Sequence, residues 1–149
     1  MTTILSIDPG GLGTGETGIA LGVFTPTEPY HLLDTWAVPD NITGFRAWYY
    51  ERWHDADVVV CEQWVDRNIR GADRSPLLIE GAVRFLWPEV VLQPASGKNT
   101  AVSDQALKNL GVYTVGGHHH DIREATRHAV LYLKHQHHMP TLKAGWPKS

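Results

Sequence analysis

The chain has 149 residues, of which 42% are hydrophobic, and a net charge of −3 at neutral pH. This length and composition predict one globular domain over residues 1–149 and exclude a disordered protein. The single cysteine excludes an intrachain disulfide and a cysteine-rich zinc site, and it fits a cytoplasmic location. Because the apolar runs are short and no basic leader precedes the first of them, we expect no membrane span and no secretory signal.

The charges are distributed unevenly along the chain. Residues 1–66 carry two basic and ten acidic side chains, whereas residues 67–149 carry eleven basic and six acidic ones. Such asymmetry allows a basic surface opposite an acidic one, so the negative net charge does not exclude a nucleic-acid partner. An acidic cluster that binds divalent metal would also be partly neutralised.

Hydrophobic periodicity in the first half predicts a strand meander, a helix and a buried strand. Apolar runs at 4–8, 18–25 and 30–38 predict three strands, and the glycine-rich loop after the first favours antiparallel pairing. Asn41 or Thr43 can cap a helix that runs to about residue 54. The continuous apolar run at 57–61 predicts a central strand that is buried on both faces.

The second half alternates helices with one more strand. The predicted elements are a polar loop at 66–75, a helix at 75–87, a strand at 90–93, and helices at 103–110 and 121–137. Residues 138–149, which contain two prolines, are expected to form a loose tail. The order β-β-β-α-β-α-β-α-α predicts an α/β fold with a central mixed five-stranded sheet flanked by helices.

Four carboxylates lie at notable places in this scheme. Asp8 and Glu62 each end an apolar strand, and Asp121 and Glu124 open the last helix. Acids at the ends of neighbouring strands lie along one rim of a sheet, where α/β proteins bind ligands. The plainer alternatives remain open, because an acid after a strand can simply be the first exposed residue and an acid in a first helical turn favours the helix dipole.

The last helix has three faces rather than the two of an ordinary amphipathic helix. Counting about 100° per residue, one face carries Asp121, Glu124 and His128, a second is apolar, and a third carries Arg123 and Arg127. The alternative for His128 is the polar edge of a core helix. The basic face would meet phosphates that flank a site on the acidic face.

Carboxylate oxygens are the ligands that Mg²⁺ or Mn²⁺ prefers. Two such ions about 3.5–4 Å apart would hold the attacking and leaving oxygens of a phosphodiester. Asp8, on the central strand, is the candidate for a carboxylate that bridges both ions. The four acids therefore predict metal-dependent phosphodiester hydrolysis.

Three segments resemble motifs of one family. ILSIDPGGLGTGETGIA, from residue 4, resembles the first motif of RuvC-type Holliday junction resolvases, and VVVCEQWV, from residue 58, resembles the second. DIREATRHAVLYL, from residue 121, is similar to their closing helix. The three motifs occur in the family's order, and together they look most like the small RuvC-like resolvases of bacteriophages.

This resemblance implies an RNase H-like fold and Mg²⁺- or Mn²⁺-dependent cleavage of branched DNA by a homodimer, without a nucleotide cofactor. It implies that Asp8 bridges two ions, that Glu62 binds one of them, and that Asp121 and Glu124 bind the other. The implied products carry 5′-phosphate and 3′-hydroxyl ends, and a phage-encoded enzyme would act in the host cytoplasm. The sequence departs from the family in a longer loop after Asp8 and in having only Lys98 in the stretch ASGKNTAVSDQ.

Further side chains are candidates for DNA contact or for proton transfer. The candidate DNA contacts are Arg67, Arg70 and Arg74 in the polar loop, Lys98, and Arg123 and Arg127 on the last helix. His120 or His128 could orient the attacking water or assist the leaving oxygen. The run His118–His120 invites a zinc interpretation, but three consecutive side chains do not easily face one ion.

Two other functions fit parts of the pattern. An actin-like or sugar-kinase ATPase also has Asp-x-Gly and Thr-Gly after a strand, but that class needs a second, duplicated lobe. A catalytically silent RNase H-like module that binds DNA or protein would not need the four acids. Magnesium-dependent cleavage without ATP separates the nuclease from both.

Overall fold

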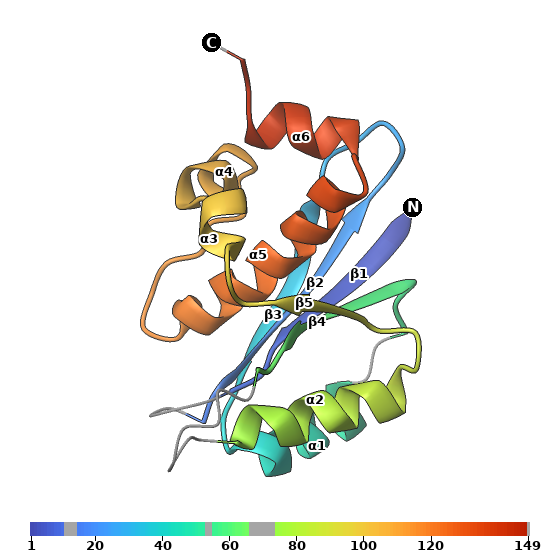
Figure 1. The fold of residues 1–149 in the computed structure, drawn as a ribbon, viewed down its shortest axis with the longest axis vertical. Coiled ribbons are helices and arrows are strands. Elements are labelled where there is room, and N and C mark those ends of the chain that lie inside the picture. Colours follow the sequence, from blue (N-terminus) through green and yellow to red (C-terminus); the bar gives the residue numbers. More distant parts are fainter. Residues whose placement is uncertain (11–14, 53–54, 66–73, 149) are drawn as a thin grey trace.

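A mixed five-stranded sheet lies between two layers of helices in the computed structural model (Figure 1). The structure describes residues 1–10, 15–52, 55–65 and 74–148. The elements are β1 (Thr2–Asp8), β2 (Thr17–Phe24), β3 (His31–Val38), α1 (Asn41–Arg52), β4 (Val58–Gln63), α2 (Ser75–Leu86), β5 (Val91–Pro94), α3 (Lys98–Ala101), α4 (Asp104–Asn109), α5 (His119–His135) and α6 (Met139–Gly145). Among the described residues, no helix is long and apolar enough to cross a membrane.

The strands are arranged in the order β3-β2-β1-β4-β5. β1, β2 and β3 form an antiparallel meander, whereas β4 and β5 run parallel to β1 and to each other. The predicted mixed five-stranded sheet is therefore confirmed. Because β1, β4 and β5 point the same way, their carboxyl ends lie along one edge, where side chains from separate segments meet.

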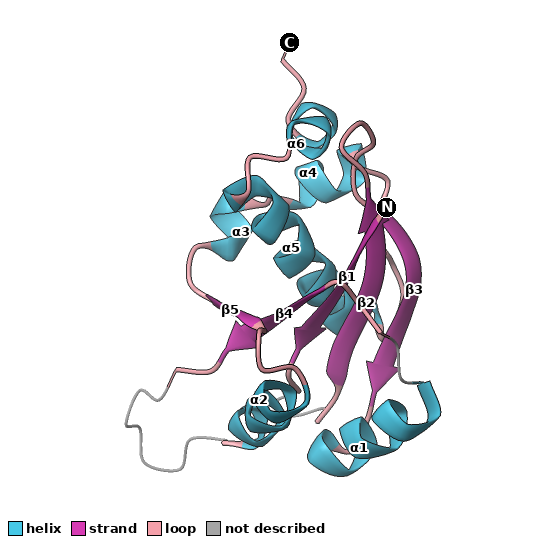
Figure 2. Cartoon of the chain, turned by 90° about the vertical axis from the view of Figure 1, so that its right-hand side faces the viewer, coloured by secondary structure: helices cyan, strands magenta, loops and turns pink. Residues whose placement is uncertain are grey.

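The central strand β1 is buried on both faces. Ile4 packs into the core beneath α5, whereas Leu5 and Ile7 pack into the core that α1 and α2 cover. β4 alternates in the same way, with Val60 on the α5 side and Val59 on the other. Figure 2 shows α5 and the short helices on one side of the sheet and α1 and α2 on the other. The two-sided burial holds the end of β1 in a fixed position.

Gly18 allows the first turn of α5 to lie directly on β2. A Cβ atom at Gly18 would stand 2.0 Å from the backbone oxygen of Asp121, so no larger residue fits without moving the helix. Gly18 also pairs with Asp8 in the β1–β2 register. The missing side chain therefore brings the start of α5 beside the end of β1.

The C-terminal segment is more ordered than the sequence predicts. The expected loose tail at 138–149 is wrong for Met139–Gly145, which forms α6. His138 caps this helix by accepting a hydrogen bond from Thr141, and Pro140 occupies the first turn, where its missing N–H costs nothing. Asn109 Nδ2 donates to the backbone oxygen of Gly145 at 2.9 Å and so ties α6 to α4. The short helix α3 lies between the predicted strand at 90–93 and the predicted helix at 103–110, where the sequence predicts no regular element.

We predict that Gly18→Ala lowers the free energy of unfolding by about 1–3 kcal/mol, the usual cost of overpacking a well-packed site. The added methyl group would push the first turn of α5 away from the sheet. Urea denaturation measures the change. Gly117→Ala is the matched control, because a Cβ there meets nothing within 4 Å. A Gly18→Ala protein as stable as the control would contradict the close approach of α5.

Candidate active site

The four predicted acids converge at the carboxyl edge of the parallel strands. Asp8 is the last residue of β1, and Glu62 is the residue before the end of β4. Asp121 and Glu124 lie in the first turns of α5, which Gly18 places over β2. Asp8 is close enough to the other three acids that each raises its pKa. The fold thus gathers the four carboxylates that the sequence singles out.

The ammonium group of Lys98 lies among these acids. Its Nζ atom is 2.6 Å from Glu62 Oε2 and 2.9 Å from Glu124 Oε2, so it joins the end of β4 to α5. Lys98 is only 8% exposed. The prediction that Lys98 contacts DNA is therefore not met by its position in this structure, because its charge points into the acid cluster. A flexible four-carbon side chain leaves its direction undetermined by the sequence.

His128 contacts Glu62 directly, and Gln93 holds His128 in place. His128 is fully buried, and its Nε2 atom lies 2.8 Å from Glu62 Oε2. Gln93, which pairs with Glu62 across β4 and β5, places its Nε2 atom 2.9 Å from the backbone oxygen of His128 and 3.1 Å from Nδ1 of the ring. The amide nitrogen donates to both, so Nδ1 accepts and the ring proton on Nε2 is donated to Glu62.

Burial and neighbouring charge shift the pKa values of the acids in opposite directions. Burial, reinforced by the charge of Glu62, raises the pKa of Asp8 well above 3.8. Burial also favours the neutral form of Glu62, but the hydrogen bond from His128 and the charge of Lys98 lower its pKa to about 2. Although burial opposes it, the charges of Asp8 and Glu62 raise the pKa of Lys98. Asp8 therefore bears most of the repulsion within the cluster.

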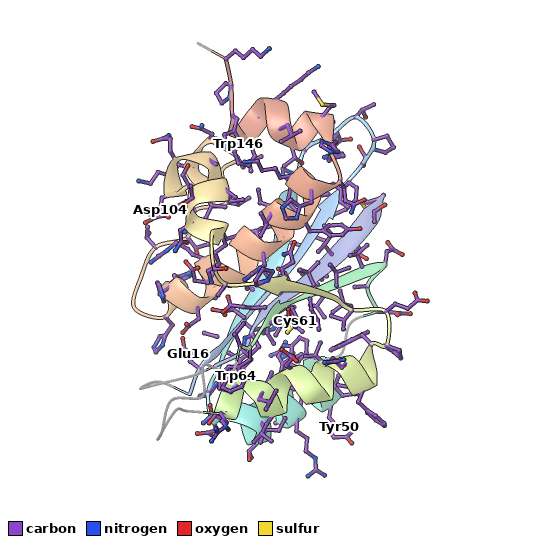
Figure 3. The ribbon with its side chains drawn as sticks, viewed as in Figure 1. Glu16, Tyr50, Cys61, Trp64, Asp104 and Trp146 are labelled. Atoms are coloured by element: carbon purple, nitrogen blue, oxygen red, sulfur yellow. The ribbon has the colours of Figure 1, made fainter. Side chains whose placement is uncertain are left out.

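Glu16 is a further acid at the site that the sequence reasoning missed. It follows the glycine-rich segment after β1 and lies beside the first turn of α5, where Nδ1 of His118 is 2.9 Å from its Oε2 atom (Figure 3). Burial first, and Glu16 second, raise the pKa of Asp121. Gln93 was missed as well. The sequence did carry a signal for each. Glu16 is an acid that closely follows the glycine-rich segment after Asp8, and Gln93 is a polar residue near the end of an apolar strand.

The basic residues predicted to contact DNA differ in how exposed their side chains are. Arg127 is only 3% exposed, and its Nη2 atom pairs with Asp104 Oδ1 at 2.6 Å, so its predicted place on an exposed basic face is wrong. Arg123 is half-buried and donates from Nη1 to the backbone oxygen of Thr114 at 2.7 Å. Arg74 is exposed at the start of α2. Arg67 and Arg70 lie outside the described residues.

The histidines at the start of α5 also have different positions. His118 pairs with Glu16, and His120 is exposed next to Asp121.

In the described part of the chain, no three His, Cys, Asp or Glu side chains are arranged to hold a metal ion as they stand. Three of the four acids nevertheless already interact with one cation, the ammonium of Lys98, which contacts Glu62 and Glu124 and is influenced by the charge of Asp8. The donor set therefore fits a hard divalent ion, provided that the lysine moves aside.

Comparisons with known proteins agree with this architecture. No family model matches the sequence, and no curated protein matches it. Among solved structures, RuvC of Thermus thermophilus in complex with a Holliday junction substrate aligns with a TM-score of 0.62 and 14% identity over 91% of this chain and 96% of that one. The fowlpox virus Holliday junction resolvase aligns with a TM-score of 0.60 and 14% identity over 89% and 99% of the two chains.

The chain has the RuvC-like resolvase fold. Its mixed five-stranded sheet flanked by helices matches these RNase H-like resolvases, which confirms the predicted fold class. Within the RuvC-like fold, the four acids and Lys98 occupy the carboxyl edge of the central strands.

We predict that Asp8→Asn raises the melting temperature of the metal-free protein by a few degrees at pH 7.5. Burial and the charge of Glu62 raise the pKa of Asp8 in the folded state, so its charged form costs stability above that pKa. Below the ordinary value of 3.8 the carboxyl is protonated in both states, and the gain should vanish. Calorimetric melts between pH 3.5 and 8 in EDTA measure this.

Asp57→Asn is the control with the opposite sign. Asp57 is exposed, and hydrogen bonds from the backbone and side chain of Thr3 lower its pKa, so its charge stabilises the fold above the unfolded pKa and is lost as pH falls. This variant should melt lower than the wild type at pH 7.5. If Asp8→Asn also melted lower there, Asp8 would not bear the repulsion described above.

Proposed function

We propose that this protein is a divalent-metal-dependent endonuclease that resolves Holliday junctions or other branched DNA. The observation that carries the proposal is the gathering of four carboxylates at the carboxyl edge of a RuvC-like fold, where a buried ammonium pairs with two of them. Four acids in one half-buried place destabilise the fold unless a cation balances them. Two of the solved structures with this fold are of proteins bound to Holliday junction DNA.

The four acids would bind the metal ions, and His128 would hold one of these acids in position. Two Mg²⁺ or Mn²⁺ ions would supply Lewis acidity at the scissile phosphate and a more acidic attacking water. Asp8 would bridge them, Glu62 would bind one, and Asp121 and Glu124 would bind the other. His128 holds Glu62 in one orientation through its Nε2 proton, so its role here is positioning rather than proton transfer to DNA. His120, exposed beside Asp121, remains the candidate for assisting the leaving oxygen.

Basic side chains near the site would hold the flanking DNA. Arg123 lies one residue from Glu124 and stacks over Tyr113, with 5.0 Å between its guanidinium carbon and the ring centre. Arg123 and Arg74 would contact phosphates, as would Arg67 and Arg70, which precede α2 in the sequence. Arg127 is not among these contacts, because its guanidinium group already donates hydrogen bonds to Asp104 and Val102.

The products would carry 5′-phosphate and 3′-hydroxyl ends, and the enzyme would act in the cytoplasm of the cell that holds the DNA.

A second copy of the chain would complete the enzyme through α2. A four-way junction presents two equivalent strands, so paired cuts need two active sites related by a two-fold axis. Leu78 and Phe85 of α2 are 60% and 84% exposed, and Gly81 lies between them on the same face with open space around it. Tyr50 of α1 and Phe85 line one apolar cavity of about 230 Å³. This exposed apolar face of α2 has no side chain at Gly81, so α2 of a second protomer could pack closely against it.

We predict that the wild type cuts a four-way junction with Mg²⁺ or Mn²⁺, and not with EDTA, and that it needs no ATP. Asp8→Asn should abolish cleavage but leave junction binding intact, because it removes a ligand charge and no phosphate contact. Cleavage of junction, flap, fork and linear duplex, with gel-shift binding, measures both properties. Asp57→Asn is the control that should keep both activities.

Each contrary outcome favours a named alternative. Wild-type cutting by Asp8→Asn would contradict the role of Asp8 at the metals. Junction binding without cleavage under either metal would favour the silent module. ATP hydrolysis would favour the actin-like class.

We predict that the double variant Leu78→Glu and Phe85→Glu is monomeric at concentrations at which the wild type is a dimer. Two buried carboxylates would replace contacts worth about 1.5–3 kcal/mol for each large apolar side chain. Sedimentation velocity measures the mass of each species. Leu33→Glu is the control, since Leu33 is 55% exposed on β3, away from α2. A monomeric wild type, or a dimer that survives the double substitution, would contradict the assignment of α2 to the interface.

A further inference from the structure

Lys98 occupies one oxygen of each of two glutamates that are proposed to bind the metal ions. Its Nζ atom contacts Glu62 Oε2 at 2.6 Å and Glu124 Oε2 at 2.9 Å, and its charge acts on Asp8 as well. Glu62 Oε2 also accepts the Nε2 proton of His128 at 2.8 Å. With two donors on one carboxylate oxygen, both of its lone pairs are engaged. A divalent ion can bind this oxygen only after the lysine has left it.

The ammonium also accounts for the spacing of the acids. Among the described residues, no three candidate ligands converge closely enough to hold an ion. The lysine stands between two of them and belongs to a third element, α3. A metal ion and an ammonium group repel each other, so the two cations compete for one place rather than share it.

The local structure gives the side chain a way out. Lys98 begins the four-residue helix α3 and follows Gly97, whose φ of 80° marks the sharp turn there. The preceding residues are exposed, so the ammonium can withdraw by rotating its own flexible stem. A groove of about 550 Å³ lies beside Asn99, the residue after Lys98, and its lining includes Glu124 and Asp104 together with Arg123 and Arg127. The charge can therefore move toward solvent without a change in the sheet.

We propose that Lys98 is an internal counter-ion that exchanges with the catalytic divalent metal. In the metal-free protein the ammonium neutralises the acid cluster, and metal binding displaces it into the groove beside Glu124. This inference rests on the proposed metal-dependent function and adds a competitor for its metal site. It also explains how a chain with four neighbouring carboxylates folds before any metal arrives.

Manganese binding to the full chain without DNA tests the exchange. Lys98→Met keeps the length of the side chain but removes its charge, so its dissociation constant for Mn²⁺ should fall by about tenfold or more in titration calorimetry. The same variant in EDTA should melt at a lower temperature than the wild type, and Mn²⁺ should close the difference. Lys108→Met is the matched control, because Lys108 is exposed and lies over the ring of Tyr113. It should bind Mn²⁺ as the wild type does.

The outcomes separate this inference from the proposed function. Equal manganese affinity in the wild type and Lys98→Met would overturn the exchange and leave metal-dependent cleavage standing. If neither protein bound Mn²⁺ and neither cut DNA, the proposed function would fail as well.

A second measurement uses the wild type and does not depend on the folding of a variant. Lys98 is 8% exposed in the metal-free arrangement, so it should resist acetylation by a small reagent. Saturating Mg²⁺ should increase its acetylation severalfold, as read by peptide mass spectrometry, while acetylation of Lys108 stays constant. Equal acetylation of Lys98 with and without Mg²⁺ would overturn the displacement.

Discussion

Repulsion among four carboxylates at one edge of the sheet is the constraint on which the rest of this site depends. Two like charges about 4 Å apart repel by about 4 kcal/mol at an effective dielectric constant near 20. The chain opposes this repulsion with a buried ammonium, a buried imidazole and the buried guanidinium of Arg127, whose Nη2 atom lies 3.4 Å from Glu124 Oε1. Lys98 joins Glu62 to Glu124, and His128 donates to Glu62 from the opposite side. Asp8 has no such direct donor in the described hydrogen bonds, and its pKa rises accordingly.

The fold supplies the geometry that makes this gathering possible. β1 and β4 run parallel, so the carboxyl ends that carry Asp8 and Glu62 lie side by side. The return strand β2 has no side chain at Gly18, which lets the first turn of α5 approach the same edge. The short helix α3 then brings a cation from a fourth segment. Residues far apart in sequence therefore meet because of strand direction and one missing side chain.

Regular patterns made the fold and the four acids predictable from sequence. Apolar strands that end in Asp8 and Glu62, and a helix that opens with two acids, fix positions along elements whose direction the topology determines. The direction of a long side chain on a short helix is not fixed in this way, which is why Lys98 was expected to face DNA. Arg127 shows the same limit, because a helical wheel gives its angle but not the presence of α3 and Asp104 opposite it. The helix α6 was not predicted, because Pro140 suggested a loop, whereas proline is also favoured in the first turn of a helix.

The acid cluster also affects the stability of the folded state as a whole. Replacement of one of these carboxylates by its neutral amide would relieve the repulsion and stabilise the metal-free fold. The structure instead places the acids together with a counter-ion, and Glu62 pairs with both Lys98 and His128. The fold therefore holds strained, like-charged groups at one edge of its sheet, and groups with such perturbed pKa values cluster at functional sites.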